Sequence, residues 1–213
     1  MPTRSVTKLT LYGNTRSGNC LKPRWLADTL GIDYNWVEVD IFAGETATEE
    51  FLELNPAGQV PLARWPDGRV LPQSNAIMLY LAEEAGSELM PQHPFKYAQM
   101  MSWLFWEQYS HEPYIAVRRS SLMFRGMSEA DLDPALLTKG RRALGIMEMQ
   151  LMSTDWLVGN EMTLADVALV AYTRVAHEGG FDLSDFPSVE RWVSRTESAL
   201  GLPHANPAEG AAL

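Results

Sequence analysis

The feature that most constrains how this chain folds is a change of sequence pattern near residue 86. Before it, segments with apolar residues at every second position alternate with segments whose apolar residues recur every three or four positions. These are the periodicities of strands and of amphipathic helices. After it, only the helical periodicity continues. The chain of 213 residues is therefore predicted to hold an α/β domain followed by an all-α domain.

Residues 1–85 form the first predicted domain, a mixed four-stranded sheet flanked by helices. Pro66-Asp67-Gly68 is a tight-turn signal, so the two strands beside it should pair antiparallel. The expected strands cover Val6–Tyr12, Tyr34–Val39, Val60–Trp65 and Arg69–Leu71, and the expected helices cover Leu21–Leu30, Thr46–Leu54 and Gln73–Glu84.

Residues 86–94 are predicted to be a linker, and residues 95–213 an all-helical domain. The first long helical pattern runs from Phe95 to Phe124 and is rich in aromatic residues. Pro113 interrupts this pattern and should kink the helix, because proline lacks an N–H group and crowds the preceding turn. Further helices are expected over Pro134–Met152, after Thr163 and after Pro187.

Charge and composition narrow the range of functions. The formal net charge is −10, whereas binding to nucleic acid or to an anionic membrane needs a basic surface. Cys20 is the only cysteine, so no intrachain disulfide can form, and the four histidines lie far apart, which argues against a metal site. We find neither a secretion signal nor an apolar run of about 20 residues. We therefore expect a cytoplasmic protein that binds no metal, nucleic acid or membrane.

The loop from Tyr12 to Cys20 joins the first expected strand to the first expected helix. Backbone N–H groups and the positive end of a helix converge at such a loop and stabilise an anion. A hydroxyl from Ser17 could donate a hydrogen bond to a thiolate there, which would lower the pKa of the thiol. The simpler interpretation of Ser17 is a helix N-cap, the commoner role of a serine at this place.

Two further segments allow the same pair of interpretations. Val60-Pro61 opens a strand, where a cis peptide would turn the Val60 backbone toward a peptide ligand and a trans peptide would be an ordinary strand start. Gln73-Ser74 begins a helix, where the Ser74 N–H and hydroxyl suit a carboxylate or cap the helix. Taken singly, each segment favours the structural interpretation.

Taken together, five pieces of sequence resemble the cytosolic glutathione transferase superfamily over nearly the whole chain. They are Leu9-Thr10-Leu11-Tyr12, Ser17-Gly18-Asn19-Cys20, Asn55-Pro56-Ala57-Gly58-Gln59-Val60-Pro61, Gln73-Ser74-Asn75-Ala76-Ile77, and Leu157-Val158-Gly159 followed by Thr163-Leu164-Ala165-Asp166. The resemblance implies a thioredoxin-like N-terminal domain that binds glutathione and a helical domain that forms a hydrophobic substrate pocket. It also implies a two-fold homodimer and a role in detoxification.

The resemblance gives the N-terminal segments their roles. Ser17 corresponds to the serine that holds the glutathione thiolate in theta, delta and several bacterial members, and Asn19 to a supporting residue. Gln59-Val60 corresponds to the segment before the cis-proline, which contacts the cysteinyl part of glutathione. Gln73-Ser74 corresponds to the pair that grips the γ-glutamyl end, although many serine-type members carry an acid where this chain has Gln73.

In the helical half, the resemblance assigns one segment to folding and another to substrate binding. Thr163-Leu164-Ala165-Asp166 corresponds to the capping box of the family's buried helix, and its spacing is that of a capping box on physical grounds too. We expect it to serve folding and not chemistry. The aromatic segment maps to the helix that lines the family's pocket, and Tyr109, His111 and Tyr114 are the candidates for contact with the second substrate.

The main prediction is an enzyme that activates the thiol of glutathione for attack on a hydrophobic electrophile or a peroxide. Tyr12 is a rival for Ser17, because other classes use a tyrosine near the end of the first strand. Cys20 is a second rival, because some relatives are glutathione-dependent disulfide reductases with a cysteine nucleophile, although we expect Cys20 to point inward as a small apolar residue. A non-catalytic binding module on the same fold is the remaining alternative.

Overall fold

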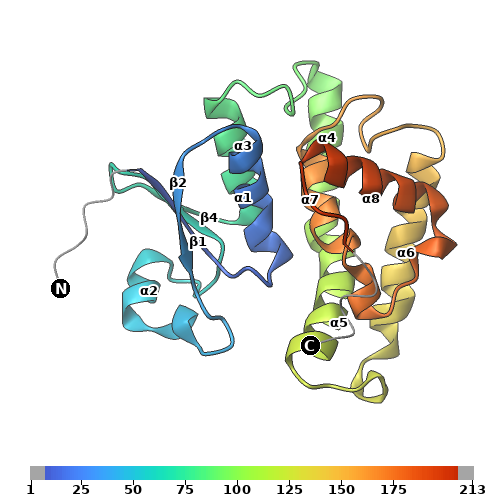
Figure 1. Ribbon diagram of the computed structural model, residues 1–213, viewed down its shortest axis with the longest axis horizontal. Helices are drawn as coiled ribbons and strands as arrows, with labels where there is room; N and C mark the ends of the chain where they lie inside the picture. Colours follow the sequence, from blue (N-terminus) through green and yellow to red (C-terminus); the bar gives the residue numbers. More distant parts are fainter. Residues whose placement is uncertain (1–7, 206–213) are drawn as a thin grey trace. The chain divides into compact units, whose positions relative to one another are not determined.

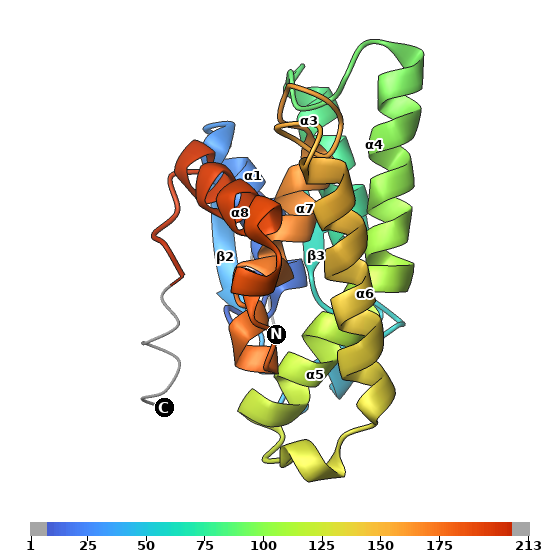
Figure 2. The same cartoon turned by 90° about the vertical axis from the view of Figure 1, so that its right-hand side faces the viewer.

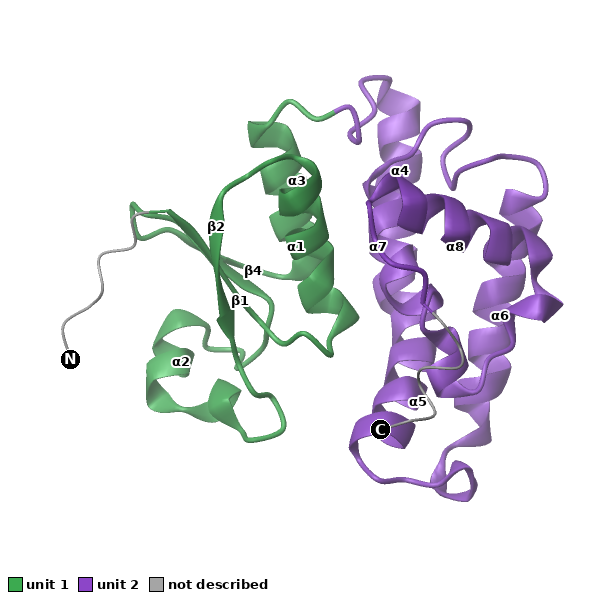
Figure 3. Cartoon of the chain, in the orientation of Figure 1, with its two compact units in different colours: residues 1–87 green, residues 88–213 purple. Residues whose placement is uncertain are grey.

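The computed structural model of the protein describes residues 8–205. The chain divides into two compact units, residues 1–87 and 88–213 (Figures 1 and 3). The division falls inside the segment 86–94 where the sequence pattern changes. None of the helices within residues 8–205 is both long and apolar enough to cross a membrane.

The first unit contains a four-stranded sheet in the order β2-β1-β3-β4. β1 (Leu9–Gly13) runs parallel to β2 (Tyr34–Glu38) and antiparallel to β3 (Leu62–Arg64), which pairs antiparallel with β4 (Val70–Pro72). The mixed sheet and the hairpin predicted from the sequence are confirmed. Residues 6 and 7, which the prediction included in the first strand, lie outside the described residues.

Three α-helices flank this sheet. α1 (Gly18–Thr29) and α3 (Ser74–Glu84) lie side by side on one face, and α2 (Glu49–Leu54) lies on the other (Figure 1). The side chains at the centre of this unit have no exposed surface; they include Leu11, Leu26, Leu62 and Ile77. Alternate residues of β1 and one face of each helix supply this core, as the two periodicities predicted.

The second predicted helix, over residues 46–54, is split in two. Glu45–Ala47 forms a 3-10 turn, and Thr48 then adopts an extended conformation with φ −68° and ψ 148°. The Thr48 hydroxyl accepts a hydrogen bond from the N–H of Phe51 at 3.3 Å. Thr48 therefore ends one helix and caps the next, because its side chain supplies a partner that the backbone would otherwise lack.

In the described part of the second unit, the regular elements are helices. They are α4 (Pro94–Trp106), α5 (Glu112–Phe124), α6 (Pro134–Leu151), α7 (Leu164–Thr173) and α8 (Pro187–Ala199). Every residue of α7 is buried, and the helix packs against α4, α5 and α8 in the middle of the unit (Figure 2). A helix that is apolar on all sides is stable only when it is enclosed in this way.

A π-helical turn at Glu107–His111 divides the helix predicted over residues 95–124 into α4 and α5. Helical residues follow one another without a break from Pro94 to Phe124. Pro113 lies directly after the π turn, in the first turn of α5. The proline thus marks the place of the disturbance correctly, and the π turn, which is also a recognised cause of helix kinks, is the feature that the sequence did not predict.

The start of α7 is the predicted capping box. The Thr163 hydroxyl accepts from the N–H of Ala165 at 3.3 Å, and the Asp166 carboxylate accepts from the N–H of Thr163 at 2.8 Å. Asp166 also accepts from the N–H of Leu157 at 3.0 Å and from Nε1 of Trp192 at 2.8 Å. Burial raises the pKa of the Asp166 carboxyl, and these hydrogen bonds lower it and so offset the increase in part. One buried carboxylate therefore connects the loop before α7, α7 itself and α8.

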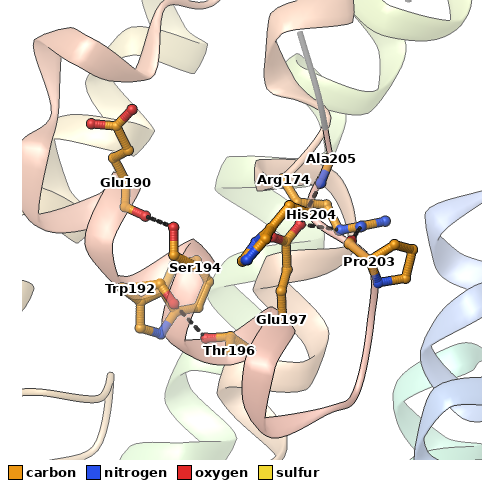
Figure 4. A network of polar contacts seen from close by, with 9 residues as sticks. All are labelled: Arg174, Glu190, Trp192, Ser194, Thr196, Glu197, Pro203, His204 and Ala205. Atoms are coloured by element: carbon orange, nitrogen blue, oxygen red, sulfur yellow. Dashed lines mark hydrogen bonds and ion pairs between the residues drawn. The ribbon is translucent and has the colours of Figure 1, made fainter. Parts of the chain in front are cut away.

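A second buried carboxylate holds the end of α8 (Figure 4). Glu197, which is 2% exposed, accepts from Nε of Arg174 at 2.7 Å and from the N–H of Ala205 at 3.1 Å. Its other oxygen lies 2.8 Å from Nδ1 of His204, and Arg174 donates in addition to the carbonyl of Pro203. These contacts fasten residues 203–205 to the C-terminal ends of α7 and α8.

Candidate active site

Three segments of the first unit meet at one edge of its sheet. Tyr12 of β1 pairs with Leu62 of β3, so the end of β1 lies beside the start of β3. Leu62 also pairs with Pro72, the last residue of β4. The loop that follows β1, the Val60-Pro61 segment before β3 and the Gln73-Ser74 segment after β4 therefore converge, although they are far apart in sequence.

Ser17 occupies the N-cap position of α1, with φ −95° and ψ 116°, but its side chain makes no capping hydrogen bond. Its half-buried hydroxyl is hydrogen-bonded instead with the sulfur of Cys20, which lowers the pKa of that thiol in part. The simpler interpretation, in which the Ser17 side chain caps the helix, is therefore wrong. The hydroxyl already lies within hydrogen-bond reach of a sulfur atom at the positive end of a helix.

Cys20 has no exposed surface. Burial raises the pKa of its thiol, and the hydrogen bond with Ser17 only partly offsets this effect. A buried, protonated thiol is a poor nucleophile. The expectation that Cys20 points inward is confirmed, and its placement speaks against the reductase alternative.

Asn14 shapes the loop that carries Ser17, and sequence reasoning did not single it out. Its Nδ2 donates to the carbonyl of Val39 at 3.1 Å, and its Oδ1 accepts from the N–H of Arg16 at 3.0 Å. The Asn14 carbonyl accepts from the N–H of Ser17 at 3.0 Å. An asparagine that follows a strand is a common turn former, which is the one signal that the sequence carried. This side chain anchors the loop to the end of β2 and sets the place of Ser17.

The Val60–Pro61 peptide is cis, as the resemblance implied and contrary to the trans form that spacing alone favoured. Asn55 shapes the turn that leads to it: its Nδ2 donates to the carbonyl of Gln59 at 2.7 Å, and its Oδ1 accepts from the N–H of Ala57 at 3.2 Å. Pro61 is buried, whereas Gln59 is exposed and Val60 is half-buried. The two residues expected to meet a ligand thus keep accessible surface.

Gln73 has an unusual backbone at the start of α3. Its φ of 76° makes it the only residue other than glycine within residues 8–205 that has a positive φ. Such a conformation costs about 1–3 kcal/mol and is found preferentially at ligand sites. Gln73 is the N-cap, so Ser74 stands inside the first turn of α3 and does not cap it. The N–H of Ser74 is therefore one of the helix-end donors that have no partner within the helix.

Asn19 links the first turn of α1 with the first turn of α3. Its Oδ1 accepts from Nζ of Lys22 at 2.8 Å and from Oγ of Ser74 at 3.4 Å. Ser74 is 4% exposed and Lys22 has no exposed surface. The residues expected near the thiolate and near the γ-glutamyl end are therefore joined by one side chain, and Lys22 is a second residue that sequence reasoning missed.

Tyr12, the rival of Ser17, faces a different part of the unit. It lines a hollow of about 290 Å³ whose other walls include Val37 of β2 and Phe51 and Leu54 of α2. Its neighbours in β1, by the alternation of a strand, point toward the opposite face. This placement supports the preference for Ser17 over Tyr12.

The sequence models of two protein domains match this chain. The glutathione S-transferase N-terminal domain matches residues 16–84, and the glutathione S-transferase C-terminal domain matches residues 99–199. The chain belongs to the glutathione S-transferase family.

Three similar proteins span most of this transferase. A solved glutathione S-transferase structure from Pseudomonas fluorescens [Pf-5] is 45% identical, with a TM-score of 0.86, and the match covers 90% of this chain and 96% of that one. Glutathione S-transferase D7 of Drosophila melanogaster is 31% identical over 172 residues, which are 79% of this chain and 75% of the relative. A structure described as Ure2p in complex with glutathione is 26% identical, with a TM-score of 0.82, over 93% of this chain and 95% of that one.

The three residues predicted to line the substrate pocket of the transferase have different surroundings. The Tyr109 side chain is 83% exposed, whereas His111 has no exposed surface and its Nε2 lies 2.9 Å from Oγ1 of Thr173. Tyr114 is half-buried, with Nζ of Lys139 5.3 Å from its ring centre. The prediction for His111 needs correction, because the π-helical turn places its ring against α7, where no substrate can reach it. Those for Tyr109 and Tyr114 stay predictions.

The groups that this transferase gathers at the sheet edge are hydrogen-bond donors. They are the Ser17 hydroxyl and the N–H groups of the first turns of α1 and α3. Donors of this kind, held in place by the fold, stabilise an anion without rearranging. Residues 8–205 contain no group of three or more His, Cys, Asp or Glu side chains placed to bind a metal ion. The arrangement suits two anions, a thiolate at α1 and a carboxylate at α3.

Proposed function

We propose that Ser17 is the catalytic residue of this transferase and that its hydroxyl donates to the thiolate of bound glutathione. The observation that carries the proposal is a hydroxyl at the N-terminus of α1 that makes no capping hydrogen bond. Donation by the hydroxyl and the positive end of the helix both favour the ionised form, so the pKa of the glutathione thiol falls. The thiolate then attacks an electrophilic carbon: a C–S bond forms, and the leaving group departs with its bonding pair.

The rest of the peptide would be held along the same edge. The N–H groups at the start of α3 suit the carboxylate of the γ-glutamyl end, beside Gln73-Ser74. The Gln59-Val60 segment, whose residues keep accessible surface, suits the cysteinyl part, where a peptide ligand can pair with the Val60 backbone as an added strand does. Asn19 stands between these two positions and completes the proposed glutathione contacts.

The second substrate is proposed to be a small hydrophobic electrophile or a peroxide, held by aromatic residues of the second unit that include Tyr109 and Tyr114. The proposed location is the cytoplasm. Both proposals follow from membership of the family and from the acidic, single-cysteine composition of the chain.

We also propose a homodimer. Phe95 and Phe105, both of α4, are 67% and 68% exposed. Large aromatic side chains gathered on a surface mark a contact face, and a second copy of the chain covers such a face by two-fold symmetry. A Phe105→Glu variant should sediment as a monomer at concentrations where the wild type sediments as a dimer. A wild type that is monomeric throughout a dilution series would contradict this proposal.

The test of Ser17 combines binding with turnover. Reduced glutathione is titrated calorimetrically into the wild type and into Ser17→Ala, and both are assayed for conjugation of glutathione to an aryl halide. We expect both proteins to bind glutathione with similar affinity, and the variant to turn over at least about tenfold more slowly. Ser184→Ala, at an exposed serine of the second unit, serves as the matched control and should behave as the wild type. Unchanged turnover in Ser17→Ala would remove Ser17 from the mechanism.

A further inference from the structure

A four-residue turn from Asn14 to Ser17 sets the place of the proposed catalytic hydroxyl. Two of its N–H groups donate within the turn: that of Ser17 to the Asn14 carbonyl and that of Arg16 to Oδ1 of Asn14, both at 3.0 Å. The N–H of Thr15 donates instead to Oε1 of Glu38 at 2.9 Å, and the Thr15 hydroxyl donates to the same oxygen at 3.2 Å. Glu38 is the last residue of β2, so a side chain of the sheet holds this turn from outside.

The second oxygen of Glu38 holds the ring of Trp36. Nε1 of Trp36 donates to Oε2 of Glu38 at 2.8 Å, and residues two apart in a strand lie on the same side of the sheet. The ring lies against Gly13, because a Cβ added at Gly13 would be only 2.5 Å from Cη2 of Trp36. The guanidinium carbon of Arg24, in α1, is 5.0 Å from the centre of the same ring. One carboxylate therefore fixes both the turn and an indole that contacts the end of β1 and α1.

The charge of Glu38 is unfavourable for an anion at the start of α1. Burial is the largest influence on the pKa of the Cys20 thiol and raises it; the hydrogen bond with Ser17 lowers it, and the charge of Glu38 raises it by a smaller amount. A glutathione thiolate at this helix end would meet the same repulsion. A neutral amide would avoid the repulsion, but it accepts through one oxygen only, whereas a carboxylate offers two. The geometry thus gives Glu38 a use that its charge does not.

We propose that Glu38 is a positioning residue of the glutathione site: its carboxylate holds the turn from Asn14 to Ser17 so that the Ser17 hydroxyl meets the glutathione sulfur. This inference rests on the proposed function of Ser17. Glu38 then acts on the reaction in two ways of opposite sign, because its hydrogen bonds favour thiolate formation through Ser17 and its charge opposes it. Substitution separates these two effects.

Glu38→Ala removes both acceptor oxygens and the charge, whereas Glu38→Gln removes the charge and keeps one oxygen for Thr15. The readouts are kcat, the glutathione KM, and the pH dependence of the ultraviolet absorbance of the bound thiolate. Glu38→Ala should lower kcat about fivefold at neutral pH and leave KM within about threefold. It should shift thiolate formation to higher pH, because the influence of Ser17 exceeds that of the charge. Glu38→Gln should keep kcat within about twofold and shift thiolate formation to lower pH.

A double-mutant cycle with Ser17→Ala tests whether Glu38 acts through Ser17. In the Ser17→Ala background, Glu38→Ala should change kcat by less than about twofold, because there is no hydroxyl left to position. Thiolate formation should now shift to lower pH, since only the effect of the charge remains. Equal losses of kcat from Glu38→Ala in the two backgrounds would overturn the proposal. A shift to lower pH with unchanged kcat in the otherwise wild-type protein would overturn it too.

Glu84→Ala is the matched control, at an exposed carboxylate that ends α3, and it should match the wild type in every readout. Glu38→Asp keeps the inference testable if Glu38→Ala fails to fold. It retains the charge but draws the carboxylate back by one methylene group, so it should lose kcat as expected for Glu38→Ala and shift thiolate formation further to higher pH. The kcat of the wild type in Glu38→Asp would overturn the role of the hydrogen bonds.

Calorimetry with reduced glutathione separates the two levels of the argument. A wild type that does not bind glutathione overturns the proposed function and this inference together. A wild type that binds, with turnover impaired by Ser17→Ala but not by Glu38→Ala, overturns this inference alone.

Discussion

Two of the helices that have a hydroxyl residue at the N-cap differ in how they use it: α1, which begins after Ser17, and α7, which begins after Thr163. The Thr163 hydroxyl accepts from the N–H of Ala165, and Asp166 returns a hydrogen bond to the N–H of Thr163. The Ser17 side chain makes no such bond and meets the sulfur of Cys20 instead. Residues of the same chemical kind, at the same place on a helix, therefore serve folding in one unit and remain available for chemistry in the other.

The surroundings of the two helices explain this difference. Every residue of α7 is buried, so each of its end donors needs a partner within the protein. α1 begins at the edge of a sheet, where Ser17 is half-buried and a ligand can satisfy the end donors. The comparison predicts that the two helix starts will respond in opposite ways to the same substitution.

The largest effect is expected from Asp166→Ala. This change leaves the N–H groups of Leu157 and Thr163 and the Nε1–H of Trp192 buried without their common acceptor. It should lower the free energy of unfolding by about 3 kcal/mol or more, since each buried donor left without a partner costs about 1–3 kcal/mol. Urea denaturation measures the free energy of unfolding. Asp155→Ala, at a side chain that is 71% exposed, should change it by about 0.5 kcal/mol at most.

Ser17→Ala is expected to separate activity from stability. Turnover should fall at least about tenfold, which corresponds to about 1.4 kcal/mol of lost transition-state stabilisation. The free energy of unfolding should stay within about 0.5 kcal/mol of the wild type, because no capping hydrogen bond is lost. Conjugation assays and urea denaturation on the same preparation measure turnover and the free energy of unfolding. If the free energy of unfolding fell as much as it does when a cap is lost, the contrast drawn between Ser17 and Thr163 would be wrong.

Thr163→Ala should show the reverse pattern. Loss of the cap should lower the free energy of unfolding by about 1 kcal/mol, while turnover per folded molecule stays unchanged. Thermal unfolding and the conjugation assay measure the two quantities. Thr163→Ser keeps the hydroxyl and should recover most of the stability. A loss of turnover in folded Thr163→Ala protein would mean that this helix start also contributes to chemistry.

At the start of α3, one residue affects both stability and the proposed binding of glutathione: Gln73. Gln73→Gly should raise the free energy of unfolding by up to about 1 kcal/mol, because glycine accepts a φ of 76° without strain. It should also weaken glutathione binding, because the side chain is lost. Gln73→Ala is the matched control: it loses the same side chain but keeps the strain, so affinity should fall without a gain in stability. Calorimetry and urea denaturation together test whether the strain serves the ligand.

The smallest effect concerns pH and the sulfur beneath Ser17. Burial raises the pKa of Cys20 above its ordinary value of 9.0 in the folded protein, so the folded state favours the protonated thiol. Its contribution to stability is therefore full below that ordinary value and is lost as the pH rises through the pKa of the folded state. Urea denaturation at a series of alkaline pH values should show this loss in the wild type and not in Cys20→Ala. In Ser17→Ala the loss should be larger, because the hydrogen bond that lowers the pKa is gone.

Local sequence determined the features that depend on neighbouring residues. The alternation of two apolar periodicities predicted the mixed sheet and the helical second half, because each period places one face against a core. Thr163 and Asp166 could be recognised as a capping box because a spacing of three residues brings them together on any helix. Ser17 and Gln73-Ser74 were proposed as site residues by resemblance, since each segment alone favoured a structural role.

Tertiary structure alone decided the rest. The register of β1, β3 and β4 brings the loop with Ser17 close to two segments that begin more than forty residues later in the chain. The positive φ of Gln73 has no signal in its residue type, because glutamine rarely adopts that conformation and only its surroundings can impose it. His111 lies in a π turn and has no exposed surface, and neither feature could be seen in the pattern of the aromatic segment. Lys22 was not singled out from the sequence, yet it has no exposed surface and its Nζ donates to Oδ1 of Asn19. In each case the deciding contact comes from residues distant in the chain, which local periodicity and propensity do not encode.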